Sequence, residues 1–274
     1  MAFVWLVSYP KSGNTWLRIL LSNYRRETPG PADLNEPLVG TQTHLSRHGF
    51  DEAIGIPSSD LCEAELVQYR YQFHAHFIQK FSGTSFTKVH ESYHGPHGAQ
   101  SVFPADRRCK VVYLIRNPLD IASSFAHHEN CSIDEIIKRM ANQDAMIHHG
   151  ETAFPEHIGP WDRHVSGWTE QGELPVLAIR YEDMLADPHD AFSRIIDFSG
   201  LALDRTKLDH AIQTSGFDAL QAQERATGFI ERPLASTHFF RNGRSGAWKE
   251  MLSDRQRDQI LCDHEATMQI FGYS

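Results

Sequence analysis

Near its start the chain places a lysine, a serine and a glycine between an apolar run and a helix-like run. Residues 9–16 read YPKSGNTW and follow the apolar run 3–7. A strand, a short glycine-containing turn and a helix start form a cradle for an anion, because backbone N–H groups and the positive end of the helix dipole converge on the turn. Lys11 adds a mobile positive charge, and Ser12 and Thr15 add hydroxyl donors. These residues indicate a phosphate or sulfate site, although such a turn is often a plain connection.

A second stretch could also hold an anion. Residues 110–115 read KVVYLI, which is typical of a strand buried on both faces of a parallel sheet, and RNPLD follows directly. Pro118 suits the first turn of a helix. Ligands of open α/β sheets bind at the carboxyl ends of strands, where Arg116 stands, with Ser124 about two helical turns beyond. The alternative is an exposed arginine and a surface serine, and for an isolated strand end that is the better interpretation.

Taken together and in this order, the two stretches resemble those of the sulfotransferases that use 3′-phosphoadenosine 5′-phosphosulfate (PAPS) and release 3′-phosphoadenosine 5′-phosphate (PAP). In that family a YPKSGTTW-like loop binds the 5′-phosphosulfate, and an RNPxDxxxS-like junction binds the 3′-phosphate. Three further matches follow in the family order: KVH at 88–90, YEDM at 181–184 and FRNGRSGAWK at 240–249. The resemblance spans about residues 3 to 250, and five ordered motifs are far more specific than any one of them.

The resemblance implies a set of donor-binding residues from these motifs, with aromatic side chains against the adenine. The set is Lys11, Ser12, Gly13, Asn14, Thr15, Trp16, Arg116, Ser124, Tyr181, Phe217, Phe240, Arg241, Asn242 and Gly243. Packing in the core is as good an explanation of Tyr181 and Phe217. Asn14 stands where the family often has threonine, although its amide can still donate a hydrogen bond. Asn242 replaces a lysine, so one positive contact to the 3′-phosphate is missing.

Sulfuryl transfer to a hydroxyl needs a base and positive groups, and the sequence offers three catalytic residues. The resemblance makes His90 the base, and the ordinary histidine pKa suits that task and predicts an ionisation near neutrality. Lys11 is expected to stabilise the leaving phosphate oxygen. Lys88 shares a strand face with His90 and is expected to contact the sulfuryl oxygens. No metal is expected, because lysine and backbone dipoles neutralise the leaving group.

Composition and length set the class of protein. The chain has 274 residues, of which 41% are hydrophobic, and this fits a single domain, 1–274, of α/β class with a mostly parallel central sheet flanked by helices. The net charge of −9 argues against a nucleic-acid surface. No run approaches the roughly 18–20 apolar residues of a membrane span, and the first strand leaves no room for a signal peptide. With four dispersed cysteines, a cytoplasmic protein is predicted.

The acceptor is expected to be a small molecule or natural product with a phenol or alcohol group. Its pocket is expected in segments that lack periodicity, with Tyr93, Phe125 and Phe229 as candidate lining residues. These segments are 25–60, 91–106, 127–162 and 218–240. Helices are predicted at 15–24, 60–81, 132–149, 189–199 and 253–270. A homodimer is possible, but the family's short dimerisation motif KxxxTVxxxE is absent after residue 249.

Two other classes of function remain open. One is a P-loop-like phosphotransferase acting on a small molecule. Against it, the lysine of the loop precedes the glycine, whereas it follows the glycine in the Walker A pattern GxxxxGK[ST]. The other is a non-catalytic nucleotide-binding protein with the same fold, in which His90 would be an ordinary histidine at a strand end. Fold alone does not decide between these classes.

Overall fold

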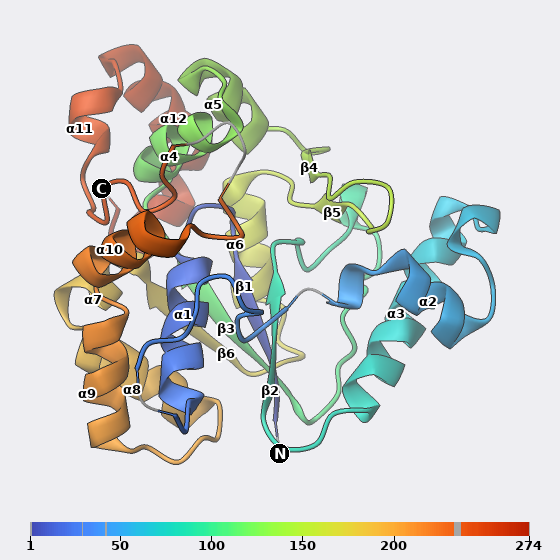
Figure 1. Ribbon diagram of the computed structural model, residues 1–274. Coiled ribbons are helices and arrows are strands. Elements are labelled where there is room, and N and C mark those ends of the chain that lie inside the picture. Colours follow the sequence, from blue (N-terminus) through green and yellow to red (C-terminus); the bar gives the residue numbers. More distant parts are fainter. Residues whose placement is uncertain (1, 29, 42, 233–236, 274) are drawn as a thin grey trace.

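Four parallel strands form the centre of the computed structural model, which describes residues 2–28, 30–41, 43–232 and 237–273. They are β1 (Phe3–Ser8), β2 (Ser85–Val89), β3 (Cys109–Ile115) and β6 (Val176–Arg180), in the order β2-β1-β3-β6. The two central strands read as apolar runs because both of their faces are covered. This architecture confirms the predicted α/β class with its parallel sheet (Figure 1).

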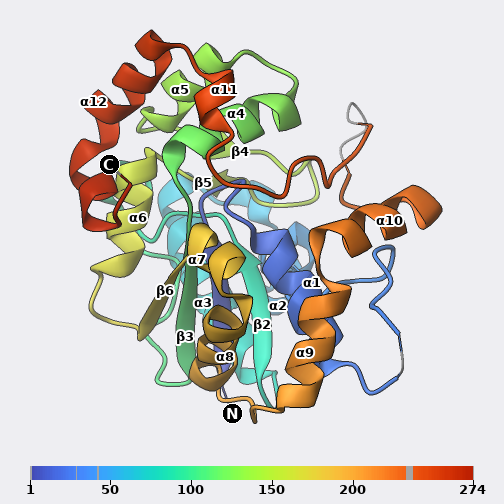
Figure 2. The same ribbon diagram turned by 90° about the vertical axis from the view of Figure 1, so that its left-hand side faces the viewer.

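Alternate side chains of β1 enter two separate cores. Trp5 belongs to the core that contains Trp161 and Trp168, whereas Leu6 belongs to the core that contains Phe192. The first core is covered by α3 (Glu63–Gln79), α6 (Trp161–Thr169) and α12 (Asp254–Ile270). The second is covered by α1 (Asn14–Arg25), α8 (Pro188–Phe198) and α9 (Arg205–Thr214). Figure 2 shows α8 and α9 in front of the sheet and α3 behind it.

The remaining helices surround the carboxyl ends of the strands or extend from the edge of the sheet. Beyond those ends lie α4 (Pro118–Glu129), α5 (Ile133–Met140), α7 (Tyr181–Ala186), α10 (Phe217–Thr227) and α11 (Trp248–Met251). With α3, α2 (Arg47–Ile54) forms a lobe beside the edge strand β2, as Figure 1 shows. Two short strands, β4 (Met146–Ile147) and β5 (Glu156–His157), pair antiparallel. Short 3-10 helices lie at Thr43–Leu45, Ser58–Asp60 and Pro96–Gly98. Among the described helices, none has both the length and the apolar character that crossing a membrane requires.

Three segments differ from the sequence-based expectation. The irregular segment 25–60 contains α2. Ser46 caps the amino end of this helix, because its hydroxyl accepts from the backbone of Gly49, and the helix buries only Phe50. One buried residue in eight leaves no periodicity to detect. The predicted helix 132–149 ends at Met140, and β4 lies within its predicted range. The segment 218–240, which lacks periodicity in the sequence, is helical up to Thr227 in α10.

Candidate active site

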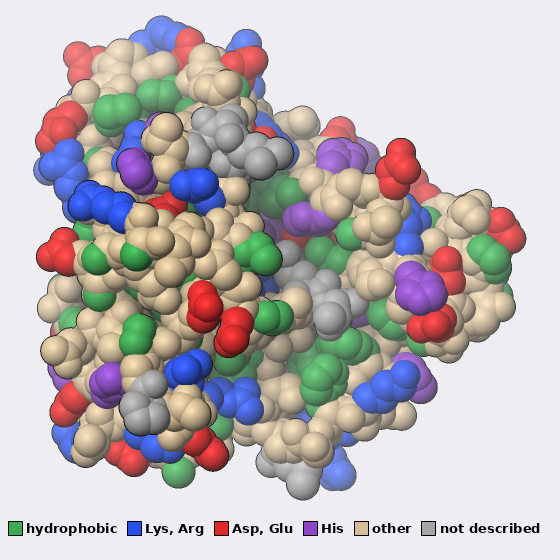
Figure 3. Space-filling view, viewed as in Figure 1, with side chains coloured by type: hydrophobic (Ala, Val, Ile, Leu, Met, Phe, Trp, Pro, Cys, Tyr) green, Lys and Arg blue, Asp and Glu red, His purple; other side chains and the backbone are tan. Residues whose placement is uncertain are grey.

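A cavity of about 810 Å³ opens at the carboxyl ends of the four parallel strands. Each strand leads into it with a residue that the sequence predicted. Lys11 follows β1, His90 follows β2, Arg116 follows β3 and Tyr181 follows β6. Figure 3 shows a hollow near the centre of the visible face, with histidine side chains at its edge. The location agrees with the general rule for ligand sites in parallel sheets.

All but one of the predicted site residues line this cavity. The lining includes Lys11, Gly13, Asn14, Thr15, Trp16, Lys88, His90, Arg116, Ser124, Tyr181, Phe217, Phe240, Arg241, Asn242 and Gly243. The exception is Ser12, whose side chain is buried and whose hydroxyl finds no partner among the residues that the structure describes. A buried hydroxyl without a partner is costly to the folded protein.

The loop after β1 is built from left-handed backbone. Lys11 has φ of 69° and Gly13 has φ of 95°, and Gly13 caps the amino end of α1. A Cβ atom on Gly13 would lie 2.7 Å from Cδ2 of Tyr181, and one on Gly243 would lie 2.2 Å from Cδ2 of Phe217. Both glycines are therefore required by a ring that packs directly on the backbone. Tyr181 and Phe217 thus serve packing and also form walls of the cavity.

Arg116 connects the two ends of the site. Its Nη1 donates to the carbonyl of Lys11 at 2.8 Å, and its Nη2 donates to the carbonyl of Arg244 at 3.3 Å. The guanidinium lies 4.3 Å from the centre of the Tyr181 ring, in the stacked arrangement that arginine favours. Its Nε is buried and has no partner among the described residues. One cation thus holds the loop after β1 next to the segment 241–249.

Two buried carboxylates hold residues 238–249, here called the late segment, over the cavity. Asp120 accepts from the backbone of Gly246 at 2.7 Å and from that of Trp248 at 3.0 Å. Glu224 accepts from the backbone of residues 239 and 240 at 2.7 and 3.0 Å. Neither acid is among the residues predicted from the sequence. Of the two, only Asp120 could have been found from the sequence, because it is the acid of the RNPLD stretch.

Ser124 and Arg241, which come from different motifs, meet next to Lys11. The three residues line a small hollow of about 40 Å³ together with His127, His128 and two residues of the late segment. Such a convergence of a hydroxyl, a guanidinium and an ammonium group is suited to an anion.

The ammonium group of Lys11 is largely withdrawn from solvent. Its Nζ lies 3.2 Å from Nδ1 of His128 and 5.2 Å from the centre of the Phe239 ring. Burial, and then the positive charges of Arg116 and Lys88, lower the pKa of Lys11 to about 8. An anionic ligand would reverse these effects, so this lysine is suited to bind one.

His90 is held so that one ring nitrogen faces the cavity. Its Nδ1 lies 2.7 Å from the carbonyl of Ser8, and because a carbonyl only accepts, Nδ1 carries the proton and Nε2 the lone pair. Its backbone N–H donates to Glu156 at 2.6 Å, and its carbonyl accepts from Nε2 of His164 at 2.9 Å. Burial, and then the charge of Lys88, lower the pKa of His90 to about 3. The imidazole is therefore neutral at neutral pH, which corrects the expected ionisation near neutrality.

Asn14, Tyr93 and Phe229 make contacts other than those predicted from the sequence, which placed Asn14 at the donor and the two aromatic residues at the acceptor. The Asn14 amide donates to the carbonyl of Leu6 at 2.8 Å, so its hydrogen bond supports the end of β1. Tyr93 lies in the main core, where its hydroxyl donates to Glu173, and Phe229 packs against Phe240 in a smaller core. Neither aromatic residue lines the cavity. Only Phe125 of the three candidate acceptor residues does.

The structure is that of an α/β protein with a cavity at the carboxyl ends of its parallel strands. The comparisons with known proteins identify the family. A sulfotransferase domain matches residues 3–272, so the chain belongs to the sulfotransferase family, the PAPS-dependent enzymes that its motifs predicted.

Similar proteins agree with this assignment. Flavonol 3-sulfotransferase of Flaveria bidentis is 26% identical over 274 residues, which cover 94% of this chain and 78% of that protein. Cytosolic sulfotransferase 13 of Arabidopsis thaliana is 27% identical over 270 residues, which cover 93% and 73%. Among solved structures, mouse sulfotransferase SULT7A1 complexed with PAP has a TM-score of 0.62 at 19% identity and covers 100% of this chain and 89% of that one. The likeness to the solved structure supports the fold.

Proposed function

We propose that the protein transfers a sulfuryl group from PAPS to the hydroxyl of a small-molecule acceptor, with His90 as general base. The observation that carries this proposal is that His90 lines the same cavity as both predicted anion-binding segments, Lys11–Trp16 and Arg116–Ser124. The cytosolic relatives further support a cytoplasmic location, and we treat 1–274 as one functional unit.

The donor would lie across the strand ends. Lys11 and the loop that follows it, most of which lines the cavity, would hold the phosphosulfate. Arg116 would bind the 3′-phosphate together with the hollow that Ser124 and Arg241 share. The aromatic walls would enclose the adenine, and they are Trp16, Tyr181, Phe217 and Phe240.

The chemistry would use the geometry of three side chains. Nε2 of His90 would take the proton of the acceptor hydroxyl as its oxygen bonds to sulfur, because Nδ1 is fixed on the carbonyl of Ser8. Lys88, on the same strand face, would stabilise the sulfuryl oxygens, and Lys11 would stabilise the phosphate oxygen released from sulfur. We propose that this arrangement operates without a metal, since its charges come from the protein.

The donor assignment is tested by nucleotide binding to wild type and to Arg116→Ala. PAP at a hundredfold excess over its dissociation constant is expected to stabilise the protein by about 2.7 kcal/mol and to raise the melting temperature, whereas ATP should do so much less.

The variant Arg116→Ala is expected to weaken the binding of PAP by about 1.5–3 kcal/mol. It should weaken the binding of AMP, which lacks the 3′-phosphate, by much less. Calorimetry with both nucleotides measures the difference, and Arg255→Ala, an exposed arginine paired with Asp134, is the control. Equal weakening of PAP and AMP would assign Arg116 a structural role instead.

A carboxylate already lies against the donor loop. Glu231 accepts from the hydroxyl of Thr15 at 3.3 Å and pairs with the guanidinium of Arg18 at 2.7 Å. This negative charge opposes the binding of an anionic donor. Its removal also leaves the buried guanidinium of Arg18 without its carboxylate partner, so that its positive charge can favour the donor. Neither Glu231 nor Arg18 is among the residues predicted from the sequence.

Glu231→Gln is therefore expected to tighten PAP binding by roughly five- to tenfold, the equivalent of about 1–1.4 kcal/mol. Titration calorimetry at low salt measures the change, and Asp134→Asn, which removes a carboxylate on another part of the surface, is the control. Unchanged or weaker binding in Glu231→Gln would mean that this carboxylate does not compete with the donor.

A further inference from the structure

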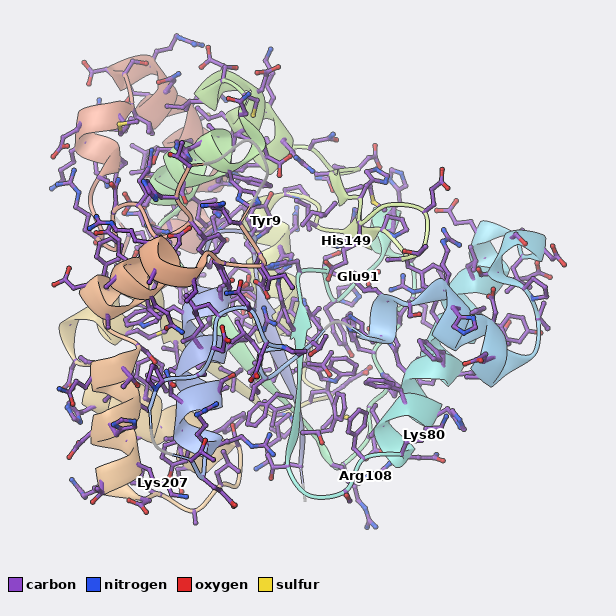
Figure 4. All side chains as sticks on the ribbon, viewed as in Figure 1. Tyr9, Lys80, Glu91, Arg108, His149 and Lys207 are labelled. Atoms are coloured by element: carbon purple, nitrogen blue, oxygen red, sulfur yellow. The ribbon has the colours of Figure 1, made fainter. Side chains whose placement is uncertain are left out.

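One of the other histidines that line the cavity is oriented by a buried carboxylate. His149 lines the cavity, and its Nε2 lies 2.8 Å from Oε2 of Glu156. The His149 side chain is 26% exposed, whereas that of Glu156 is 0% exposed. Figure 4 shows His149 near the short strands β4 and β5, on the side of the molecule to which the central strands lead.

The same carboxylate also fixes the chain at the predicted base. Oε1 of Glu156 accepts from the backbone of His90 at 2.6 Å and from that of Glu91 at 3.1 Å. Burial alone would raise the pKa of Glu156, but the hydrogen bond from His149 and the neighbouring imidazoles lower it below its usual value. An ionised buried carboxylate with these donors holds the ring of His149 and the backbone of His90 in one fixed relation.

The hydrogen bond to Glu156 determines which ring nitrogen of His149 can accept a hydrogen bond from a ligand. Because a carboxylate accepts, Nε2 of His149 carries a proton, and in the neutral ring Nδ1 keeps a lone pair. That nitrogen can accept a hydrogen bond from an O–H group. His90 already serves the reacting hydroxyl in the proposed function, so His149 is available for another group of the same acceptor.

We propose that His149, oriented by Glu156, is a specificity-determining residue that accepts a hydrogen bond from a second hydroxyl of the acceptor. The inference rests on the proposed function, and it assigns the acceptor to the di- or polyhydroxylated compounds. An acceptor with one hydroxyl on an apolar frame would bury this imidazole without a partner. Sites built to hydrogen-bond a substrate hydroxyl discriminate strongly against analogues that lack it.

The test compares acceptors that differ in one O–H group. Catechol and resorcinol are each compared with their monomethyl ethers, which lose one O–H donor and gain one methyl group. The wild type is expected to show a kcat/KM at least tenfold higher for the diol in one of the pairs. His149→Phe is expected to bring that ratio to within twofold by lowering turnover of the diol, while the ether changes by less than about threefold. PAP binding, measured in parallel, shows that the variant is folded.

Two further variants separate this role from a merely structural one. His189→Phe makes the same change at an exposed histidine that also contacts a carboxylate, Asp209 at 3.4 Å, and should leave the ratio unchanged. Glu156→Gln should lower the ratio as His149→Phe does, because the ring loses its ionised partner.

The outcomes distinguish this inference from the function on which it rests. If the wild type sulfates ethers as well as diols, or if His149→Phe keeps the ratio, the inference is wrong and the proposed function stands. If the wild type binds PAP but sulfates no member of either pair, the proposed acceptor class is wrong and the inference fails with it.

Discussion

Lys11→Met is expected to lower kcat by about 10²–10³-fold and to weaken PAP binding. Lys11 places a positive charge in a buried site, where one preorganised contact to developing negative charge typically has this effect on rate. Methionine keeps the length of the side chain, and it meets the same left-handed backbone at φ of 69° that lysine does. The variant therefore removes the charge with little other change. Single-turnover kinetics and calorimetry measure the two effects separately.

The pKa of Lys11 adds a dependence on pH. Its pKa is lowered to about 8, first by burial and then by Arg116 and Lys88. Below that pH the ammonium group is present in the free protein, and above it the group must first take up a proton to bind an anion. The affinity for PAP is therefore expected to fall as the pH rises above about 8 in the wild type and to fall much less in Lys11→Met. The same decline in both proteins would assign the titration to another group.

The sequence predicted those parts of the site that local chemistry determines. The strands β1 and β3 are continuous apolar runs, which predict a buried parallel sheet. Lys11 and Arg116 follow these strands, so the sequence also predicts that both lie at the edge formed by the carboxyl ends of the strands. Gly13 and Gly243 lie within motifs and have the conformations that only glycine adopts readily. For these residues the spacing in the sequence already implies the position in space.

The parts that the sequence did not predict depend on contacts between distant segments. Glu156 reaches the backbone of His90 from 66 positions away, and no periodicity marks an acid in a strand of two residues. Glu231 likewise reaches Thr15 of α1 from the loop that follows α10. Tyr93 follows β2 closely, yet its ring enters the core because Phe103 and Trp168 pack against it. Aromatic side chains in irregular segments give no signal that separates a pocket wall from a core residue.

His90→Ala is expected to lower kcat by about 10²–10⁴-fold while PAP binds within about twofold of wild type. The backbone of His90 keeps its contacts with Glu156 and His164 in the variant, so the main loss in the protein is the bond from Nδ1 to Ser8. The ring should contact the acceptor hydroxyl, and donor affinity therefore does not depend on it. His94→Ala is the control, because His94 is exposed and does not line the cavity.

The pH profile gives a second measure of the same role. Burial and Lys88 lower the pKa of His90 to about 3 from an ordinary value of 6.5, so the neutral base persists in mildly acidic solution. With saturating PAPS, kcat/KM for the acceptor is expected to show its acidic limb well below pH 6.5, and His90→Ala is expected to lose that limb. Turnover of His90→Ala within twofold of wild type, with chemistry rate-limiting, would place the base elsewhere. The cavity then offers His128, His148 and His149 as the imidazoles to replace next, since all three line it.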